Sequence, residues 1–256
     1  MGTRLTSAFL LGLAALLLVR CGSEPAAPRS TPKPAEIQKT RVAAPAFNAD
    51  SAYAYIAQQV AFGPRVPNTP EHVACGDWLS SELTRHGADV IEQPGLVRAY
   101  DGTILRIRNF IGQFRPENRE RILLFAHWDT RPFADKDTLR MREPIDGAND
   151  GGSGVGVLLE IARLLGADST LDVGVDIVFF DAEDYGTPEW GEKNQNSALT
   201  WCLGSQYWAN QPHRIGYNAK YGILLDMVGA EGAVFNKEGT SMAYAPTVVK
   251  RLWESA

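Results

Sequence analysis

The chain has 256 residues, 45% of them hydrophobic, and a formal net charge of −5 from 25 basic and 30 acidic residues. This length and composition suit a single globular domain with a sizeable core and short appendages. Because no run of lysine and arginine exceeds two residues, the charge pattern argues against a nucleic-acid partner. Several acidic residues stand instead inside apolar segments, where burying a carboxylate is costly.

Residues 1–20 are typical of an export signal. Arg4 gives a positive start, and residues 8–19 form an apolar run that is too short to span a bilayer. Cys21 follows in a setting that resembles a bacterial lipoprotein lipobox, although Arg20 occupies a position where a small residue is usual. We therefore expect an exported protein, in the periplasm or anchored to a membrane only by a lipid on Cys21. Ordinary cleavage without a lipid is the alternative.

Residues 21–46 predict a flexible tether, because they are rich in Pro, Ala, Ser, Thr and Lys and show no apolar periodicity. The folded domain is expected over residues 47–256. Its first helix is expected to be capped by Asp50 and to continue to Val60. The chain stops three residues after Trp253, inside a predicted helix, so we expect this domain to be incomplete at its C-terminus.

Strands and helices then alternate along the chain. Predicted strands cover 104–114, 121–127, 173–181 and 221–228, and predicted helices cover 70–86, 154–165 and 197–208, with a further helix starting at 246. The apolar face expected for the helix at 70–86 consists of Val73, Trp78, Leu79 and Leu83. Short apolar strands alternating with helices predict an α/β fold with a mixed, mainly parallel central sheet and helices on both faces.

Two cysteines follow the export region. Cys75 and Cys202 could pair in a disulfide, since exported proteins meet an oxidising environment. They could equally remain two unpaired buried thiols, and the sequence leaves both interpretations open.

Acidic side chains gather where the predicted strands end. The residues concerned are His127 and Asp129, Asp150 of a glycine-rich loop, Asp181, Glu183 and Asp184, and Asp226. Ligand sites in open α/β sheets lie at the carboxyl ends of the strands, so we expect these side chains to converge on one cleft. Arg131 is the nearest basic residue and supplies a single charge, so the carboxylates would repel one another strongly. A divalent cation relieves this repulsion, and carboxylates with a histidine suit zinc.

Each of these residues also has a plainer interpretation. Asp150 could be an ordinary helix cap in a glycine-rich turn. His127 could be a packed core residue rather than a metal ligand or an orienting group. The adjacent Glu183 and Asp184 could form an exposed acidic loop, rather than one side chain that binds a metal beside another that transfers protons.

Together these segments resemble the M28-type zinc aminopeptidase family, from about residue 46 to the end of the chain. The matching motifs are H-x-D at 127–129, GANDGGSG at 147–154, DAED at 181–184 and LLDMVG at 224–229. The resemblance implies a divalent-metal site in which Asp150 and Asp184 are ligands and Glu183 is the general acid and base. His127 and Asp226 match positions that bind a second zinc ion in the two-metal aminopeptidases.

Within this fold the chain more closely resembles the glutaminyl cyclases. That likeness rests on FGPRVPNTPEH at 62–72, the long segment between His127 and Asp150, Trp190, and LGSQYWA at 203–209. It implies one zinc ion per chain, held by Asp150, Asp184 and a histidine from a later loop, with His127 and Asp226 tuning the site. The histidines of the chain are His72, His86, His127 and His213, and none matches that later ligand. Asp184 stands where most of the family has Glu.

The resemblance implies conversion of an N-terminal glutamine to pyroglutamate with release of ammonia. The expected partners are therefore peptide and protein N-termini, and we expect a monomer. Zinc would polarise the side-chain carbonyl, while Glu183 moves the proton and Asp226 raises the pKa of Glu183 by like-charge proximity. Trp190 and Trp201 could wall the pocket, or simply pack in the core. The alternatives are a two-zinc M28 aminopeptidase and an inactive M28-like surface binding protein.

Overall fold

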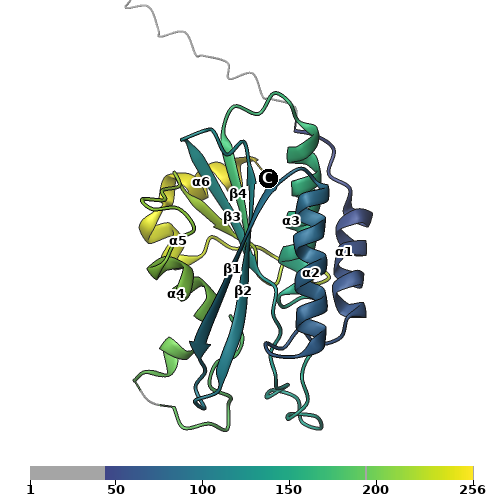
Figure 1. Ribbon diagram of the computed structural model, residues 1–256, viewed down its shortest axis with the longest axis vertical. Coiled ribbons are helices and arrows are strands. Elements are labelled where there is room, and N and C mark those ends of the chain that lie inside the picture. The colour runs from purple at the N-terminus through teal and green to yellow at the C-terminus, as the bar shows by residue number, and fades with distance from the viewer. Residues whose placement is uncertain (1–43, 194, 256) are drawn as a thin grey trace, which may run out of the picture. The chain divides into compact units, whose positions relative to one another are not determined.

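The computed structural model describes residues 44–193 and 195–255 (Figure 1). The predicted signal peptide, Cys21 and residues 21–43 of the predicted tether lie outside the described residues. The regular elements, in chain order, are α1 (Ala49–Ala61), α2 (Pro70–Arg85), β1 (Asp89–Arg98), β2 (Ile104–Phe114), β3 (Arg121–His127), α3 (Gly152–Ala167), β4 (Gly174–Phe180), the 3-10 helix η1 (Ser197–Thr200), α4 (Leu203–Asn210), β5 (Gly222–Leu224), α5 (Gly239–Tyr244) and α6 (Pro246–Ser255). None of the described helices is long and apolar enough to cross a lipid bilayer.

The strands form one mixed, five-stranded sheet in the order β1-β2-β4-β3-β5. β2 pairs antiparallel with both β1 and β4, whereas β3 pairs parallel with both β4 and β5. The mixed sheet predicted from the sequence is confirmed, and its parallel part holds the three strands that lead to the acidic residues. His127 is level with Phe180, and Phe125 is level with Leu224, so these three strands end at the same edge of the sheet.

Helices cover both faces of this sheet, as predicted (Figure 1). α1, α2 and α3 lie on one face, where α1 packs on α3 and α3 packs on β3, and α4, α5 and α6 lie on the other side. The main core lies between the sheet and the first three helices, and its buried members include Leu79, Leu83, Phe110, Trp128, Leu158 and Phe179. Every residue of β4 is buried, because this strand is covered on both faces.

The first two helices differ from the prediction in detail. The side chain of Asn48, not that of Asp50, caps α1 by accepting a hydrogen bond from a backbone N–H of the first turn. Val73, expected on the apolar face of α2, is 49% exposed, because the buried face follows the helical spacing of Cys75 and Leu79.

The strand β1 was not predicted. Pro94 and Gly95 stand in its middle, and both residues disfavour a strand interior. β1 is nevertheless an edge strand, and proline is tolerated there because one side of an edge strand has no neighbouring strand that needs its N–H groups.

The region around Cys202 also departs from the prediction. The helix expected over 197–208 is split into η1 and α4, because Cys202 between them adopts the left-handed conformation, with φ 56° and ψ 35°. The strand expected over 221–228 is shortened to β5, which pairs with β3 at the edge of the sheet. Cys75 and Cys202 are both free, so the structure shows unpaired thiols rather than a disulfide.

Candidate active site

Three side chains from different segments meet at the edge where the parallel strands end. His127 closes β3, Asp150 lies in the loop before α3, and Asp226 follows β5. The Nε2 atom of His127 lies 3.0 Å from Asp150 Oδ1 and 3.7 Å from Asp226 Oδ1. Each of the three residues offers one ligand atom, and these atoms lie within 4.8 Å of one another. We call this group the His-Asp-Asp trio.

Two glycines allow the loop and α3 to approach the strand ends closely. Gly151 has φ 79°, and a Cβ at this position would lie 2.6 Å from the carbonyl oxygen of Asp129. A Cβ at Gly154 would lie 2.3 Å from the carbonyl oxygen of Leu225. The glycine-rich segment therefore packs tightly against the residues that follow β3 and β5, which places Asp150 beside the other members of the trio.

Asp129 supports the loop that carries Glu183 and Asp184. Its Oδ1 accepts a hydrogen bond from the backbone N–H of Glu183 at 2.9 Å, and its Oδ2 accepts one from Asp184 at 3.1 Å. The same carboxylate lies 3.5 Å from Nδ1 of His127, and Asp129 is fully buried. Because its oxygens are engaged in this way, Asp129 orients its neighbours rather than facing the open cleft.

Asp181 does not join the cleft, so the expectation that it would converge with the other acids was wrong. Both of its carboxylate oxygens lie 2.9 Å from Nε2 of His72, and they also accept the backbone N–H groups of Arg108 and Ala182. His72 in turn stacks on Trp128 with a centroid distance of 4.3 Å. The strand ends before the chain turns at Ala182, with φ 49°, so Asp181 stays in the core while the next two acids reach the site.

Asp184 is a buried carboxylate with an unsatisfied oxygen. It is 5% exposed, and its Oδ2 has no hydrogen-bond partner. Arg131 donates from Nη1 to the carbonyl oxygen of Asp184 at 3.0 Å and lies 3.5 Å from its Oδ1. Burial, followed by the charges of Asp129, Asp150 and Glu183, raises the pKa of Asp184 to about 8.

Glu183 lines a small cavity together with His127 and Asp226 of the His-Asp-Asp trio. Burial is the main cause that raises the pKa of Glu183, and the Asp226 carboxylate adds to the increase, in the direction expected from like charges. The thiol of Cys202 lies 3.1 Å from Glu183 Oε1. This contact was not predicted from the sequence, because no local pattern links Glu183 to a cysteine in a later segment.

Two cavities adjoin these residues. The first is an open cleft of about 660 Å³, lined by Arg131, Phe133, Ala134, Asp135, Lys136, Asp137, Ile145, Asp150, Asp184, Glu189 and Trp201. The second is a small cavity of about 80 Å³, lined by Phe125, Ala126, His127, Phe180, Glu183, Cys202, Ser205, Leu224 and Asp226. The two predicted metal ligands therefore border the open cleft, and the predicted proton-transfer residues border the small cavity.

The two tryptophans expected at the pocket differ in their contacts. Trp201 lines the open cleft, and the guanidinium of Arg131 lies 4.6 Å above its ring. Trp190 packs edge-to-face on Phe133 at 5.3 Å, and Phe133 lines the cleft. Trp190 is 38% exposed, so it is not a core residue, and it contacts the cleft through Phe133.

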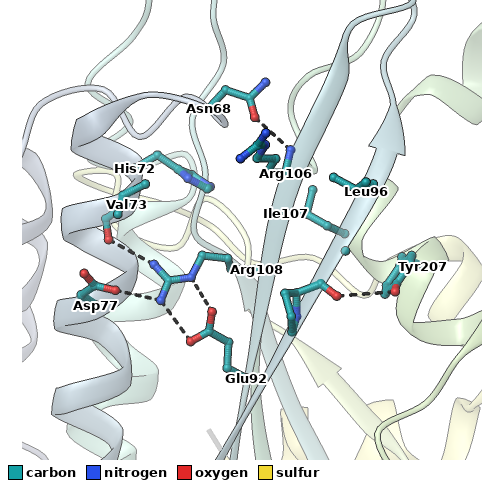
Figure 2. A pocket seen from close by; sticks show the side chains of 12 residues that line it. Asn68, His72, Val73, Asp77, Glu92, Leu96, Arg106, Ile107, Arg108 and Tyr207 are labelled. Atoms are coloured by element: carbon teal, nitrogen blue, oxygen red, sulfur yellow. Dashed lines mark hydrogen bonds and ion pairs between the residues drawn. The ribbon is translucent and has the colours of Figure 1, made fainter.

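A larger groove of about 1140 Å³ lies between α2 and β1 (Figure 2). Arg108 is fully engaged there, donating to Glu92, Asp77 and the carbonyl oxygen of Val73. None of the metal-binding or proton-transfer residues predicted from the sequence lines this groove. The open cleft, although smaller, is therefore the candidate active site.

The donor atoms at the candidate site fit a divalent cation. His127 is 3% exposed, yet neither of its ring nitrogens makes a hydrogen bond of acceptable geometry. Burial lowers the pKa of His127, but the carboxylates of Asp129, Asp150 and Asp226 outweigh it and raise the pKa well above its usual value. Buried polar atoms without partners, among several carboxylates, are the arrangement that a bound ion satisfies. Carboxylates with an imidazole suit zinc.

The predicted ligands are divided within the site. Asp150 belongs to the His-Asp-Asp trio, whereas Asp184 lies outside it and borders the same cleft. All four histidines lie among the described residues, and only His127 lies at the site. His72 contacts Asp181, His86 contacts Tyr55, and His213 contacts Trp208.

Comparisons with known proteins agree with this fold. A family model described as peptidase family M28 matches residues 109–256. A Zn-dependent exopeptidase from Parabacteroides distasonis is 58% identical, with a TM-score of 0.80, and the match covers 83% of this chain and 73% of that protein. No match was found among curated proteins.

Two solved glutaminyl cyclases are similarly close. The enzyme from Bacteroides thetaiotaomicron, bound to N-acetylhistamine, is 56% identical with a TM-score of 0.80, over 82% of this chain and 72% of that one. The enzyme from Tannerella forsythia is 58% identical with a TM-score of 0.79, over the same shares of the two chains. With the family match spanning the parallel strands and every residue of the candidate site, this chain belongs to peptidase family M28.

Proposed function

We propose that this protein is a zinc-dependent glutaminyl-peptide cyclotransferase, which converts N-terminal glutamine to pyroglutamate. The observation that carries this choice is the 56% and 58% identity to two solved glutaminyl cyclases over 82% of the chain. The site supports it, because a half-buried glutamate, Glu183, lies next to carboxylates and a histidine that fit a divalent ion. The substrates are peptides or proteins that begin with glutamine.

In this proposal, Glu183 moves the proton. In the reaction, the α-amine nitrogen of the substrate forms a bond with its own side-chain amide carbon, and the amide nitrogen leaves as ammonia. Glu183 accepts the proton from the attacking amine and returns it to the leaving nitrogen, so the carboxylate is unchanged after each turnover. A zinc ion, when bound, polarises the amide carbonyl. Asp150 and Asp184 are the side chains in the open cleft that would hold it.

The open cleft suits the first residue of a peptide. Phe133 and Trp201 give it apolar walls, while Asp150 and Asp184 lie among its lining residues. Asp226 lies 3.7 Å from His127 Nε2 and adds negative charge near Glu183. The cleft therefore combines two aromatic side chains with several charged ones, which suits a substrate residue that has an aliphatic stem and a polar end.

The test is to incubate the protein with two peptides that differ only in beginning with glutamine or leucine, and to analyse the products by mass spectrometry. We expect loss of ammonia from the glutamine peptide and no change in the leucine peptide. The Glu183→Gln variant is the control, since it keeps the size of the side chain and removes the base. Removal of the first residue from either peptide would instead identify an aminopeptidase. No reaction with either peptide would favour an inactive binding protein.

A two-zinc aminopeptidase is the second candidate, and the His-Asp-Asp trio favours it. His127, Asp150 and Asp226 form a three-ligand set of their own, so Asp150 could be shared with a second ion at Asp184. The zinc content of the purified protein separates the two candidates. One zinc ion per chain agrees with the cyclase, and two tightly bound ions would exclude it.

We also propose that the protein is exported, anchored by a lipid on Cys21 and monomeric. The support is in the sequence, where an apolar run at 8–19 precedes Cys21. Cell fractionation of the Cys21→Ala variant tests the anchor, because the variant should leave the membrane fraction. Size-exclusion chromatography with light scattering tests the monomer.

A further inference from the structure

A thiol contacts the carboxylate that moves the proton in the proposed reaction. The Sγ atom of Cys202 lies 3.1 Å from Oε1 of Glu183, and Cys202 is half-buried. Both residues line the small cavity of about 80 Å³, together with His127 and Asp226. Neither residue lines the open cleft. The contact between the thiol and Glu183 therefore lies in the small cavity rather than in the open cleft.

The thiol is a hydrogen-bond donor in this contact. Burial, followed by the Glu183 carboxylate, raises the pKa of Cys202 to about 12, so the sulfur carries its proton at neutral pH. A protonated thiol beside a carboxylate donates to it, and it is a poor nucleophile. Cys202 is therefore a poor nucleophile, and its thiol acts instead as a hydrogen-bond donor to Glu183.

The backbone holds Cys202 against the same loop. The N–H groups of Cys202, Leu203 and Gly204 donate to the carbonyl oxygens of Glu183, Ala182 and Asp181, at 2.9, 2.9 and 3.0 Å. Residues 202–204, at the start of α4, and residues 181–183 are therefore joined by three consecutive hydrogen bonds. These backbone hydrogen bonds fix the distance between the Cα atoms of Cys202 and Glu183, independently of the side-chain conformations.

The conformation of Cys202 is costly for a residue with a side chain. With φ 56° and ψ 35°, it lies in the left-handed region that glycine and asparagine adopt more readily. A left-handed residue at a functional site is a reason to ask what its side chain does there. Here the conformation places the sulfur in the small cavity, within reach of Glu183.

We propose that Cys202 is a positioning residue, whose thiol holds the Glu183 carboxylate in the orientation from which it transfers the proton. A hydrogen bond to Oε1 restricts rotation of the carboxylate and therefore limits the directions in which Oε2 can point. This inference rests on the proposed function, in which Glu183 accepts and returns the proton. It adds a residue that touches neither the substrate cleft nor the carboxylates that would hold zinc.

The location of the thiol predicts which kinetic constant depends on it. Because Cys202 touches Glu183 and does not line the open cleft, its loss should lower kcat and leave KM nearly unchanged. Loss of a hydrogen bond to a charged group should lower kcat by about tenfold. This value is at the lower end of the usual range for such bonds, because a thiol is a weak donor. Serine keeps a donor at the same position, so Cys202→Ser should recover most of the kcat that Cys202→Ala loses.

The experiment compares the wild type, Cys202→Ala, Cys202→Ser and Cys75→Ala as full-length proteins. Cys75 is the matched control, because it is also a free cysteine, but it is buried in the apolar core beneath α2 and does not contact Glu183. kcat and KM are measured with the glutamine peptide, and the melting temperature of each variant checks that it is folded. We expect kcat to fall about tenfold in Cys202→Ala, and to stay within about twofold of the wild type in Cys202→Ser and Cys75→Ala.

Three results would overturn the proposal. They are an unchanged kcat in Cys202→Ala, an equal loss in the alanine and serine variants, or a loss confined to KM. The product formed by the wild type reports separately on the proposed function. If that product is a shortened peptide, cyclisation is wrong, but the ratio of variant to wild-type kcat still tests whether Cys202 positions Glu183.

Discussion

The imidazole of His127 faces the carboxylate of Asp150, with Nε2 3.0 Å from Oδ1. This pair joins the end of a central strand to the loop before α3, and Asp150 also borders the open cleft with Asp184. Asp150 is therefore common to both arrangements of metal ligands that the site allows. Its removal should have the same consequence whether the protein holds one zinc ion or two.

We predict that Asp150→Asn abolishes tight zinc binding and lowers kcat/KM by at least about 100-fold, because the change removes a charged ligand. Zinc content is measured by atomic spectroscopy on the purified variant, and kcat/KM with the glutamine peptide. Asp172→Asn is the control, since Asp172 is an exposed acid outside both cavities. A variant that keeps full zinc content and loses only activity would show that Asp150 acts on the substrate instead.

Asp129 is predicted to act through the backbone of its neighbours. In Asp129→Asn, one of the two backbone N–H groups, of Glu183 or Asp184, would face an NH2 group and lose its acceptor. We expect a loss of about 1–3 kcal/mol in the free energy of unfolding, measured in urea, and a lower kcat. If the variant were as stable and as active as the wild type, the two hydrogen bonds would not be what holds this loop.

Much of the fold follows from the sequence, because it depends on patterns that are local. The apolar runs at 121–127 and 173–181 predicted β3 and β4 nearly to the residue, since strands covered on both faces need continuous apolar side chains. β1 escaped prediction, because its proline is tolerated only at an edge. The sequence cannot show where the edge lies until the strand order is known.

The candidate site was predictable only in part, for a similar reason. The convergence of Asp150 and Asp226 on His127 follows from parallel strands that end at one edge. Asp181 has the same sequence setting, and it is instead bound to His72, which lies far away in the chain. The contact of Cys202 with Glu183 depends on the left-handed conformation of Cys202, which no sequence pattern predicted.

Trp201 is predicted to contribute to substrate binding. It lines the open cleft and carries the Arg131 guanidinium on its ring, so Trp201→Ala removes a wall and frees a cation that contacts Asp184. We expect KM for the glutamine peptide to rise by about tenfold, since an aromatic contact of this kind contributes about 1–2 kcal/mol. Trp201→Phe keeps a ring under Arg131 and should show a smaller rise. Equal KM values in both variants and the wild type would exclude Trp201 from the binding site.

The pH dependence of stability is predicted to depend on a buried ion pair away from the site. Arg121 donates to both carboxylate oxygens of Asp176, at 2.7 and 2.6 Å, and the two side chains are 2% and 0% exposed. Burial alone would raise the pKa of Asp176, but the hydrogen bonds from Arg121, Tyr217 and Gln113 outweigh burial and lower it. A carboxyl whose pKa is lower in the folded state stabilises the fold above its unfolded pKa of about 3.9. That contribution is lost as the pH falls through the folded pKa.

Asp176→Asn should therefore be destabilised by about 3–5 kcal/mol at neutral pH, because Arg121 would be left buried without its counter-charge. The difference from the wild type, measured by urea unfolding at several pH values, should be full above about pH 5 and shrink below about pH 4. Asp77→Asn is the control, since its pair with Arg108 leaves the Asp77 side chain 66% exposed and should contribute less than about 1 kcal/mol. If Asp176→Asn lost as much free energy of unfolding at pH 3 as at pH 7, the ionised carboxylate would not be the cause of the loss. The cause would then be the shape of the buried network around Tyr217.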